Sequence, residues 1–189
     1  MKRTSEILKS LCDKSREEVT IGEMIKESGS RTHGFALLLF ALPEAVPLPL
    51  PSVSIVLGIP LVLISAHLII FGEGSGIPER LRRQRVRASV VQKAAKHMIP
   101  VFEKLERVSR QRFEGLASRH RLLGVACLLL SIVILLPIPL ANFAPAACLA
   151  AIAFGMLQRD GVIVMIGLIG SAALIATLVA VTASVANNG

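Results

Sequence analysis

The sequence predicts an all-α integral membrane protein, made of two internal repeats followed by a C-terminal transmembrane helix. First, the 189 residues are 53% hydrophobic with a mean hydropathy of +0.66, which is more apolar than a typical water-soluble domain. Second, residues 1–33 and 72–122 contain every charged residue except Glu44, Arg159 and Asp160. Third, an apolar segment interrupted by prolines occurs twice along the chain. Long apolar blocks between charged blocks are typical of membrane proteins.

The first repeat is predicted over residues 1–71, with an amphipathic helix at about 5–28 lying on the membrane surface and a membrane hairpin over 34–71. The first arm stops being helical near Val46, because PLPLP at 47–51 lacks a backbone N–H donor at every second residue and favours an extended chain. This arm reaches about 18 Å, and the second arm, 53–71, reaches about 28 Å, against a hydrocarbon core of about 30 Å. Two positions of the proline-rich turn stay open: packed within the protein or around a polar cavity at membrane depth, or in a loop outside the membrane.

Residues 72–93 are predicted to form a basic cytoplasmic linker between the repeats. Cytoplasmic loops are rich in Lys and Arg, so we expect the N-terminus and residues 72–122 on the cytoplasmic side. Five arginines of the linker are expected to contact anionic lipid headgroups: Arg80, Arg82, Arg83, Arg85 and Arg87. Nucleic acid is not expected as a partner, because no recognition module accompanies the charge.

The second repeat is predicted over residues 94–161, with an amphipathic helix at about 94–118 and a membrane hairpin over 122–157. An offset of ninety residues aligns it with the first repeat and matches four pairs that apolar composition does not explain. These pairs are Arg31 and Arg121, Gly34 and Gly124, Pro47 and Pro137, and Pro49 and Pro139. The repeats are parallel if both hairpins enter from the same side, and inverted if one arm dips in without crossing; the sequence leaves both arrangements open.

A C-terminal transmembrane helix is predicted over residues 162–185, where the apolar run reaches about 36 Å. Arg159 and Asp160 precede it and are expected to form a turn and a charge anchor at the interface, with a substrate clamp as the less favoured alternative. The helix carries small residues at every fourth position, which allow close approach of another helix from the same chain or from a second subunit in a homodimer. These residues are Ala172, Ala176, Ala180 and Ser184.

Glu44 is the main candidate for a functional role within the apolar segments. An ionised carboxylate is costly in hydrocarbon, so we expect it to face a cavity, find a partner or take a proton; the alternative is that it binds backbone N–H groups freed beside the prolines. His67 could meet Glu44 if the two arms fold back on each other, although a single His in an apolar helix is more often structural. The candidate cavity residues are Pro43, Glu44, Pro47, Pro49, Pro51, His67, Pro137 and Pro139.

The sequence contains no catalytic motif that we recognise, so an enzyme, a cofactor and a metal ion are not expected. Cys12, Cys127 and Cys148 lack the spacing of metal ligands. The predicted function is a small transporter or ion-coupled permease with a cavity at the broken helices. The alternative is a membrane scaffold that transports nothing, and an enzyme acting on lipid-linked sugar ranks last because no nucleophile and base are paired.

Several stretches together resemble the exopolysaccharide synthesis family ExoD. They are Pro43-Glu44-Ala45 with the following prolines, Gly58-Ile59-Pro60, Pro137-Ile138-Pro139 and Arg159-Asp160-Gly161. The resemblance covers about residues 5–185. It implies a multi-pass protein of the bacterial inner membrane, connected with exopolysaccharide production, with the machinery that makes it, and with tolerance of alkaline conditions. The family often has Gln at the position of His67, which argues against an essential proton relay at that residue.

Overall fold

The computed structural model describes residues 18–20, 32–45, 51–72, 83, 85–87, 103, 109, 113–136 and 142–188. The helices are α3 (Thr32–Glu44), α4 (Pro51–Phe71), α7 (Glu114–Ala117), α8 (His120–Leu135), α9 (Phe143–Gln158) and α10 (Gly161–Asn188). Two strands, β1 (Glu18–Thr20) and β2 (Arg85–Arg87), form an antiparallel pair. The prediction of a helical protein is therefore confirmed, with one short ladder added. Pro47, Pro49, Pro137, Pro139, Arg80 and Arg82 lie outside the described residues.

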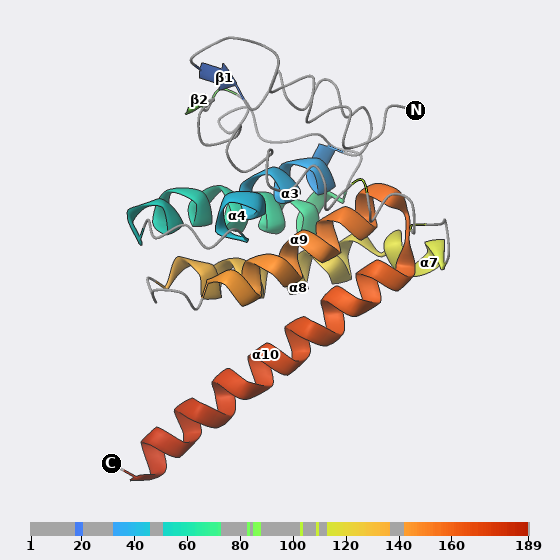
Figure 1. Ribbon diagram of the computed structural model, residues 1–189. Helices are drawn as coiled ribbons and strands as arrows, with labels where there is room; N and C mark the ends of the chain where they lie inside the picture. The colour runs from blue at the N-terminus through green and yellow to red at the C-terminus, as the bar shows by residue number, and fades with distance from the viewer. Residues whose placement is uncertain are drawn as a thin grey trace.

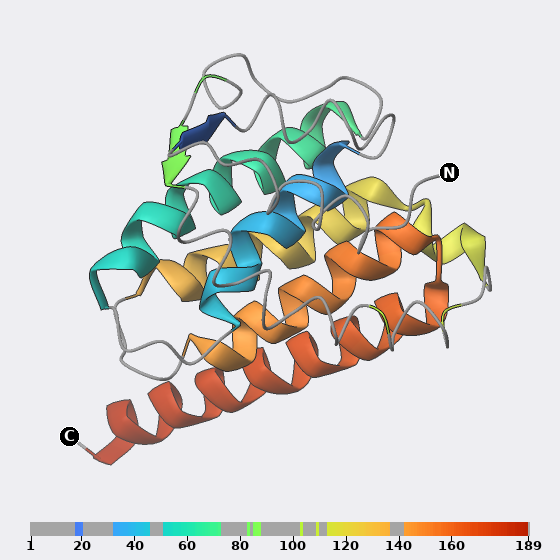
Figure 2. The same cartoon turned by 45° about the horizontal axis from the view of Figure 1, so that its top comes forward.

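Four of the described helices form two antiparallel hairpins, α3–α4 and α8–α9, that pack against each other (Figure 1). The pairing is crossed, because α4 packs on α8 while α3 packs on α9. Both hairpins point the same way, with α3 and α8 beginning at the end where α4 and α9 finish (Figure 2). Close contacts agree with this direction: Gly124 at the start of α8 lies against Ile69 near the end of α4, and Gly58 lies against Leu135.

The helix α3 occupies the centre of this arrangement. Every residue from Thr32 to Pro43 is buried, as expected for a helix that is apolar on all sides. Its 13 residues reach only about 20 Å, so it is shorter than a bilayer core. The first arm of the first hairpin is thus a short internal helix.

The helices α4 and α8 pack closely because a glycine lies at their contact. A Cβ atom added to Gly124 would lie 2.8 Å from Cγ1 of Ile69 and 3.2 Å from its backbone nitrogen. Further along the same contact, the buried hydroxyls of Ser65 and Ser131 lie 3.5 Å apart, and Ser131 donates a 2.6 Å hydrogen bond to the Cys127 carbonyl. The Ser131 proton is therefore used within α8, and Ser65 is the donor across the contact.

The C-terminal helix predicted at 162–185 is confirmed as α10. Among the described residues, it is the one helix that is both long and apolar enough to cross a membrane. Its first half packs on α9, where Gly167 meets Ile152, and its second half extends away from the other helices (Figure 1). The small residues of the predicted packing stripe are all exposed, and all but the first of them lie in this second half: Ala172, Ala176, Ala180 and Ser184.

Two parts of the predicted interfacial helices are wrong. Within 5–28, residues 18–20 form β1, whose backbone pairs in antiparallel register with residues 85–87; Val19 and Thr20 are β-branched, which favours a strand. Within 94–118, the helix does not run through Phe113, whose φ of 52° lies in the left-handed region. Phe113 is 72% exposed and precedes the single turn α7. The other parts of the two predicted helices lie largely outside the described residues.

Candidate functional site

The two ends of the buried helix α3 carry its ionisable side chains. His33, the second residue of the helix, is fully buried, and Glu44, the last residue, is half-buried. They are eleven positions apart, which corresponds to about 17 Å along the helix. The residues between them are apolar, so only His33 and Glu44 in this helix can carry a charge or exchange a proton.

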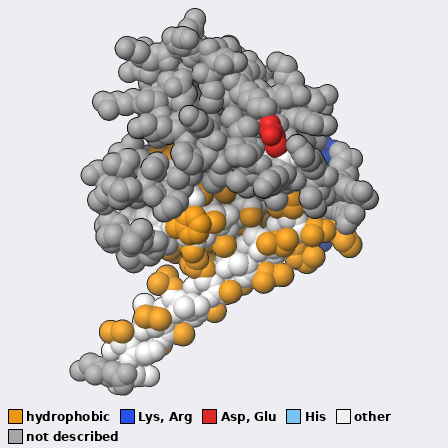
Figure 3. All heavy atoms as spheres, in the orientation of Figure 1, with side chains coloured by type: hydrophobic (Ala, Val, Ile, Leu, Met, Phe, Trp, Pro, Cys, Tyr) orange, Lys and Arg blue, Asp and Glu red, His pale blue; other side chains and the backbone are white. Residues whose placement is uncertain are grey.

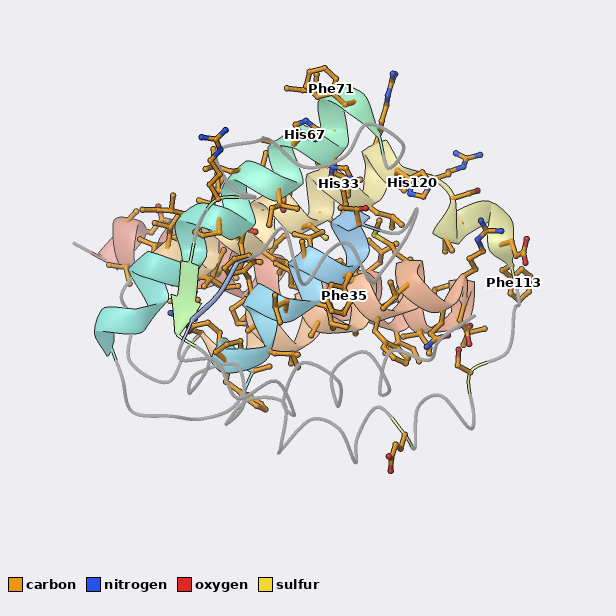
Figure 4. All side chains as sticks on the ribbon, turned by 90° about the horizontal axis from the view of Figure 1, so that it is seen from above. His33, Phe35, His67, Phe71, Phe113 and His120 are labelled. Atoms are coloured by element: carbon orange, nitrogen blue, oxygen red, sulfur yellow. The ribbon has the colours of Figure 1, made fainter. Side chains whose placement is uncertain are left out.

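His33 forms a pair with His67 of α4 (Figure 4). Its Nε2 atom lies 3.0 Å from Nδ1 of His67, and the ring planes are 17° from parallel with centroids 5.2 Å apart. Since the centroids are much farther apart than the nitrogens, the rings meet through their edges, as a hydrogen bond in the ring plane requires. One neutral imidazole must donate and the other accept. The ring of Phe71 lies against His67, at a centroid distance of 4.6 Å.

The pairing corrects the expectation for His67. We expected His67 to reach Glu44 when the two arms fold back, but the arms run antiparallel and His67 lies in the last turns of α4. It therefore meets the start of α3, whereas Glu44 lies at the opposite end. His33 was missed in the sequence, although its position in RTHG, directly before the first apolar run, was an available signal.

Glu44 ends α3 at the turn between the hairpin arms. The carbonyl of Ala41 accepts a hydrogen bond from Ala45, so the last helical turn closes just beyond Glu44. The carboxylate lies at the negative end of the helix dipole, where a second negative charge is unfavourable and a proton or cation is favoured. Pro43 is buried in the same turn, and Pro51 is the first residue of α4, a position that suits proline.

The second hairpin has a different group at the equivalent position. Ile134, which aligns with Glu44, is fully buried, and its carbonyl accepts a 3.0 Å hydrogen bond from Nδ2 of Asn142. Asn142 is buried directly before α9 and so satisfies a free carbonyl at the end of α8. The chemistry at the ends of the two hairpins is therefore asymmetric: a carboxylate in the first and a neutral amide in the second.

Arg159 and Asp160 form the turn between α9 and α10. Arg159 has a φ of 55°, and the backbone nitrogens of Arg159 and Asp160 bond to the carbonyls of Met156 and Gly155, which is a Schellman ending with Arg in the usual glycine position. The buried Asp160 side chain accepts hydrogen bonds from Val162 N at 3.0 Å and from Ser109 Oγ at 3.0 Å. Asp160 thus caps α10, while Arg159 is exposed.

His120 lies at the start of α8, at the same end of the molecule as the histidine pair (Figure 4). Burial, and then the positive charge of Arg159, lower the pKa of His120 below its usual value of 6.5. This side chain is therefore neutral near pH 7. Within the described residues, no group of three or more His, Cys, Asp and Glu side chains could hold a metal ion.

A family model described as "Exopolysaccharide synthesis, ExoD" matches residues 4–181. The chain belongs to the ExoD family. The ExoD match covers both hairpins and most of α10, and it associates the protein with exopolysaccharide synthesis.

Two curated relatives are similar over much of the chain. An uncharacterised protein of Synechocystis sp. is 26% identical over 175 residues, covering 90% of this chain and 82% of the relative. Protein ExoD of Rhizobium meliloti is 29% identical over 154 residues, covering 77% of this chain and 63% of the relative. No solved structure matches the chain.

Proposed function

We propose that this ExoD protein is a small ion-coupled permease of the bacterial inner membrane that supports exopolysaccharide synthesis. The observation that carries the proposal is the half-buried carboxylate of Glu44 at the C-terminal end of a helix that is itself buried. The transported species is a proton or a small monovalent cation, bound by this carboxylate. The basic linker then lies in the cytoplasm, and both hairpins enter the membrane from that side.

The end of α3 provides the chemistry that such a site needs. In transporters, half-helices that end inside the membrane present backbone carbonyls, and these bind Na⁺ or H⁺ together with acidic side chains. The helix α3 is short in this way, and its last turn combines the negative end of the helix dipole with a carboxylate. A bound proton or cation neutralises both, which lowers the cost of keeping the acid away from water.

The arrangement of the two hairpins supports a single ion-binding site, located in the first hairpin. The helices α3 and α8 end at the same end of the four-helix core (Figure 2), but only the end of α3 carries an acid. At the second, Asn142 already satisfies the carbonyl of Ile134. We therefore infer that the second hairpin acts as the structural support against which the first hairpin binds its ion.

Flux measurements on purified protein in liposomes test the proposal. Under an imposed pH or cation gradient, a pH-sensitive dye should report flux above that of empty vesicles, and Glu44→Gln should reduce it at least tenfold because Gln cannot ionise. Glu114→Gln is the matched control, since Glu114 is an exposed acid on α7. Equal flux for wild type and Glu44→Gln, or none above empty vesicles, contradicts the proposal.

A scaffold without transport is the second candidate. It is supported by the second half of α10, which extends from the other helices and exposes its small residues, including Ala176 and Ala180. Such a face allows close approach of a helix from another protein of the exopolysaccharide machinery or from a second copy. Replacing both residues with Leu should then abolish co-purification with the partner and leave folding unchanged. Loss of polysaccharide from this variant, with intact flux, would favour the scaffold.

A further inference from the structure

Exposed arginines and an apolar stripe meet at the start of α8. Arg119 and Arg121 flank its first residue, and both are exposed. Arg159, from the end of α9, is also exposed and lies near enough to His120 to lower its pKa. Two elements thus bring three guanidinium groups to one end of the core.

The backbone of α8 adds to the positive charge at this end. The first turn contains no acidic residue, and the preceding Arg119 forms no side-chain cap. The backbone N–H of His120 donates to the carbonyl of Ser118, and the helix dipole at this end favours an anion. The nearby carboxylate of Asp160 is buried and accepts hydrogen bonds from Val162 N and Ser109 Oγ.

An exposed apolar stripe starts directly below the arginines. Its members recur at intervals of three and four residues along one face of α8 and are 46–53% exposed: Leu122, Val125, Leu129, Ile132 and Leu136. Arg121 stands four residues before Val125, which places it on the same face. From Leu122 to Leu136 the stripe is about 21 Å long, and one leaflet of the hydrocarbon core is about 15 Å thick.

We propose that this surface, formed by Arg119, Arg121, Arg159 and the stripe on α8, binds one anionic phospholipid. The arginines and the N-terminus of α8 hold the headgroup phosphate, and an acyl chain lies along the stripe. A soluble phosphate would use only the basic end. The apolar stripe that continues from it favours a lipid. Figure 3 shows hydrophobic side chains gathered over the lower face of the molecule, with Lys and Arg atoms at its edge on the α7 side.

Native mass spectrometry of the full-length protein in detergent tests the site. Wild type should retain one phosphatidylglycerol at concentrations at which phosphatidylcholine is lost. Replacing Arg119, Arg121 and Arg159 together with Gln should weaken this binding about a hundredfold, which is roughly fivefold for each basic residue. Arg121→Gln alone should weaken it roughly fivefold, and all three arginines are exposed, so folding should be retained by circular dichroism.

Matched variants separate this site from its alternatives. Leu63→Gln changes an apolar residue on α4 that is exposed to the same extent as the stripe and should leave the retained lipid in place; an equal loss from Leu63→Gln would overturn the site as general adsorption of lipid to apolar surface. Leu129→Gln, within the stripe, should weaken the binding of phosphatidylglycerol. Millimolar glycerol phosphate, added to wild type, should not displace the bound lipid. Displacement by glycerol phosphate would show a site for free anions and overturn the lipid assignment. Because the readout is bound lipid, failure of ion flux would leave this result unaffected.

Discussion

His33 Nε2 and His67 Nδ1 lie 3.0 Å apart, and this contact joins the start of α3 to the end of α4. It closes the first hairpin opposite its proline-rich turn. A Gln amide at position 67 could also donate or accept a hydrogen bond. The contact is therefore best explained as a hairpin closure that requires a polar partner for His33.

Replacing His67 tests this closure. We expect His67→Leu to lower the free energy of unfolding by about 1–3 kcal/mol, because the buried His33 ring loses this partner. His67→Gln should stay close to wild type. Thermal unfolding in detergent, followed by circular dichroism, measures both variants. Equal stability of the Leu and Gln variants would show that the hydrogen bond contributes nothing.

Gly124→Ala should destabilise the contact between α4 and α8. The added Cβ would approach the Ile69 backbone nitrogen to 3.2 Å, so the helices must separate, at a cost of about 1–3 kcal/mol. Gly115→Ala is the control, since a Cβ there meets nothing within 4 Å and Ala favours a helix by up to about 1 kcal/mol. Chemical unfolding curves measure the free energy of unfolding of both variants. An equal free energy for Gly124→Ala and Gly115→Ala would exclude close packing at Gly124.

Asp160→Ala should remove the cap of α10. Val162 N then loses its acceptor, with an expected loss of about 1 kcal/mol. Asp160→Asn keeps an acceptor oxygen and should restore most of the stability. Unfolding midpoints in detergent measure the series. If Asn and Ala lower stability equally, the negative charge, and not the cap, is what Asp160 contributes.

His120 makes the stability of the protein dependent on pH. Because its pKa in the folded state is below 6.5, the unfolded chain binds the proton more readily, and this contribution to stability is lost as the pH falls below about 6.5. His120→Gln should flatten the stability profile between pH 5 and 7. Arg159→Gln should raise the pKa of His120, which NMR titration of the imidazole measures directly. An unchanged pKa would show that Arg159 is too far away to act.

Local pattern predicted much of the fold. The apolar runs before and after the prolines are α3, α4, α8 and α9, with ends within a few residues of the expected ones, because proline removes donors wherever it occurs. Glu44 stood out because a carboxylate is rare in such a run. By contrast, β1 was not predicted. Residues 18–20 pair with residues 85–87, which are distant in the sequence, and the local pattern around 18–20 does not indicate this partner.

Hydrophobicity and proline act locally, so the residue pattern is enough to predict short apolar helices separated by charged segments, with one long apolar helix after them. The three-dimensional arrangement is needed to show that α3 is buried on every side, that it packs on α9 while α4 packs on α8, and that His67 meets His33 and not Glu44. These contacts depend on which helix faces are complementary in shape. Gly124 allows α8 to approach α4 closely, and Gly167 allows α10 to approach α9 closely. An apolar helix has similar hydrophobicity on all sides, so its sequence pattern does not predict which other helices pack against it.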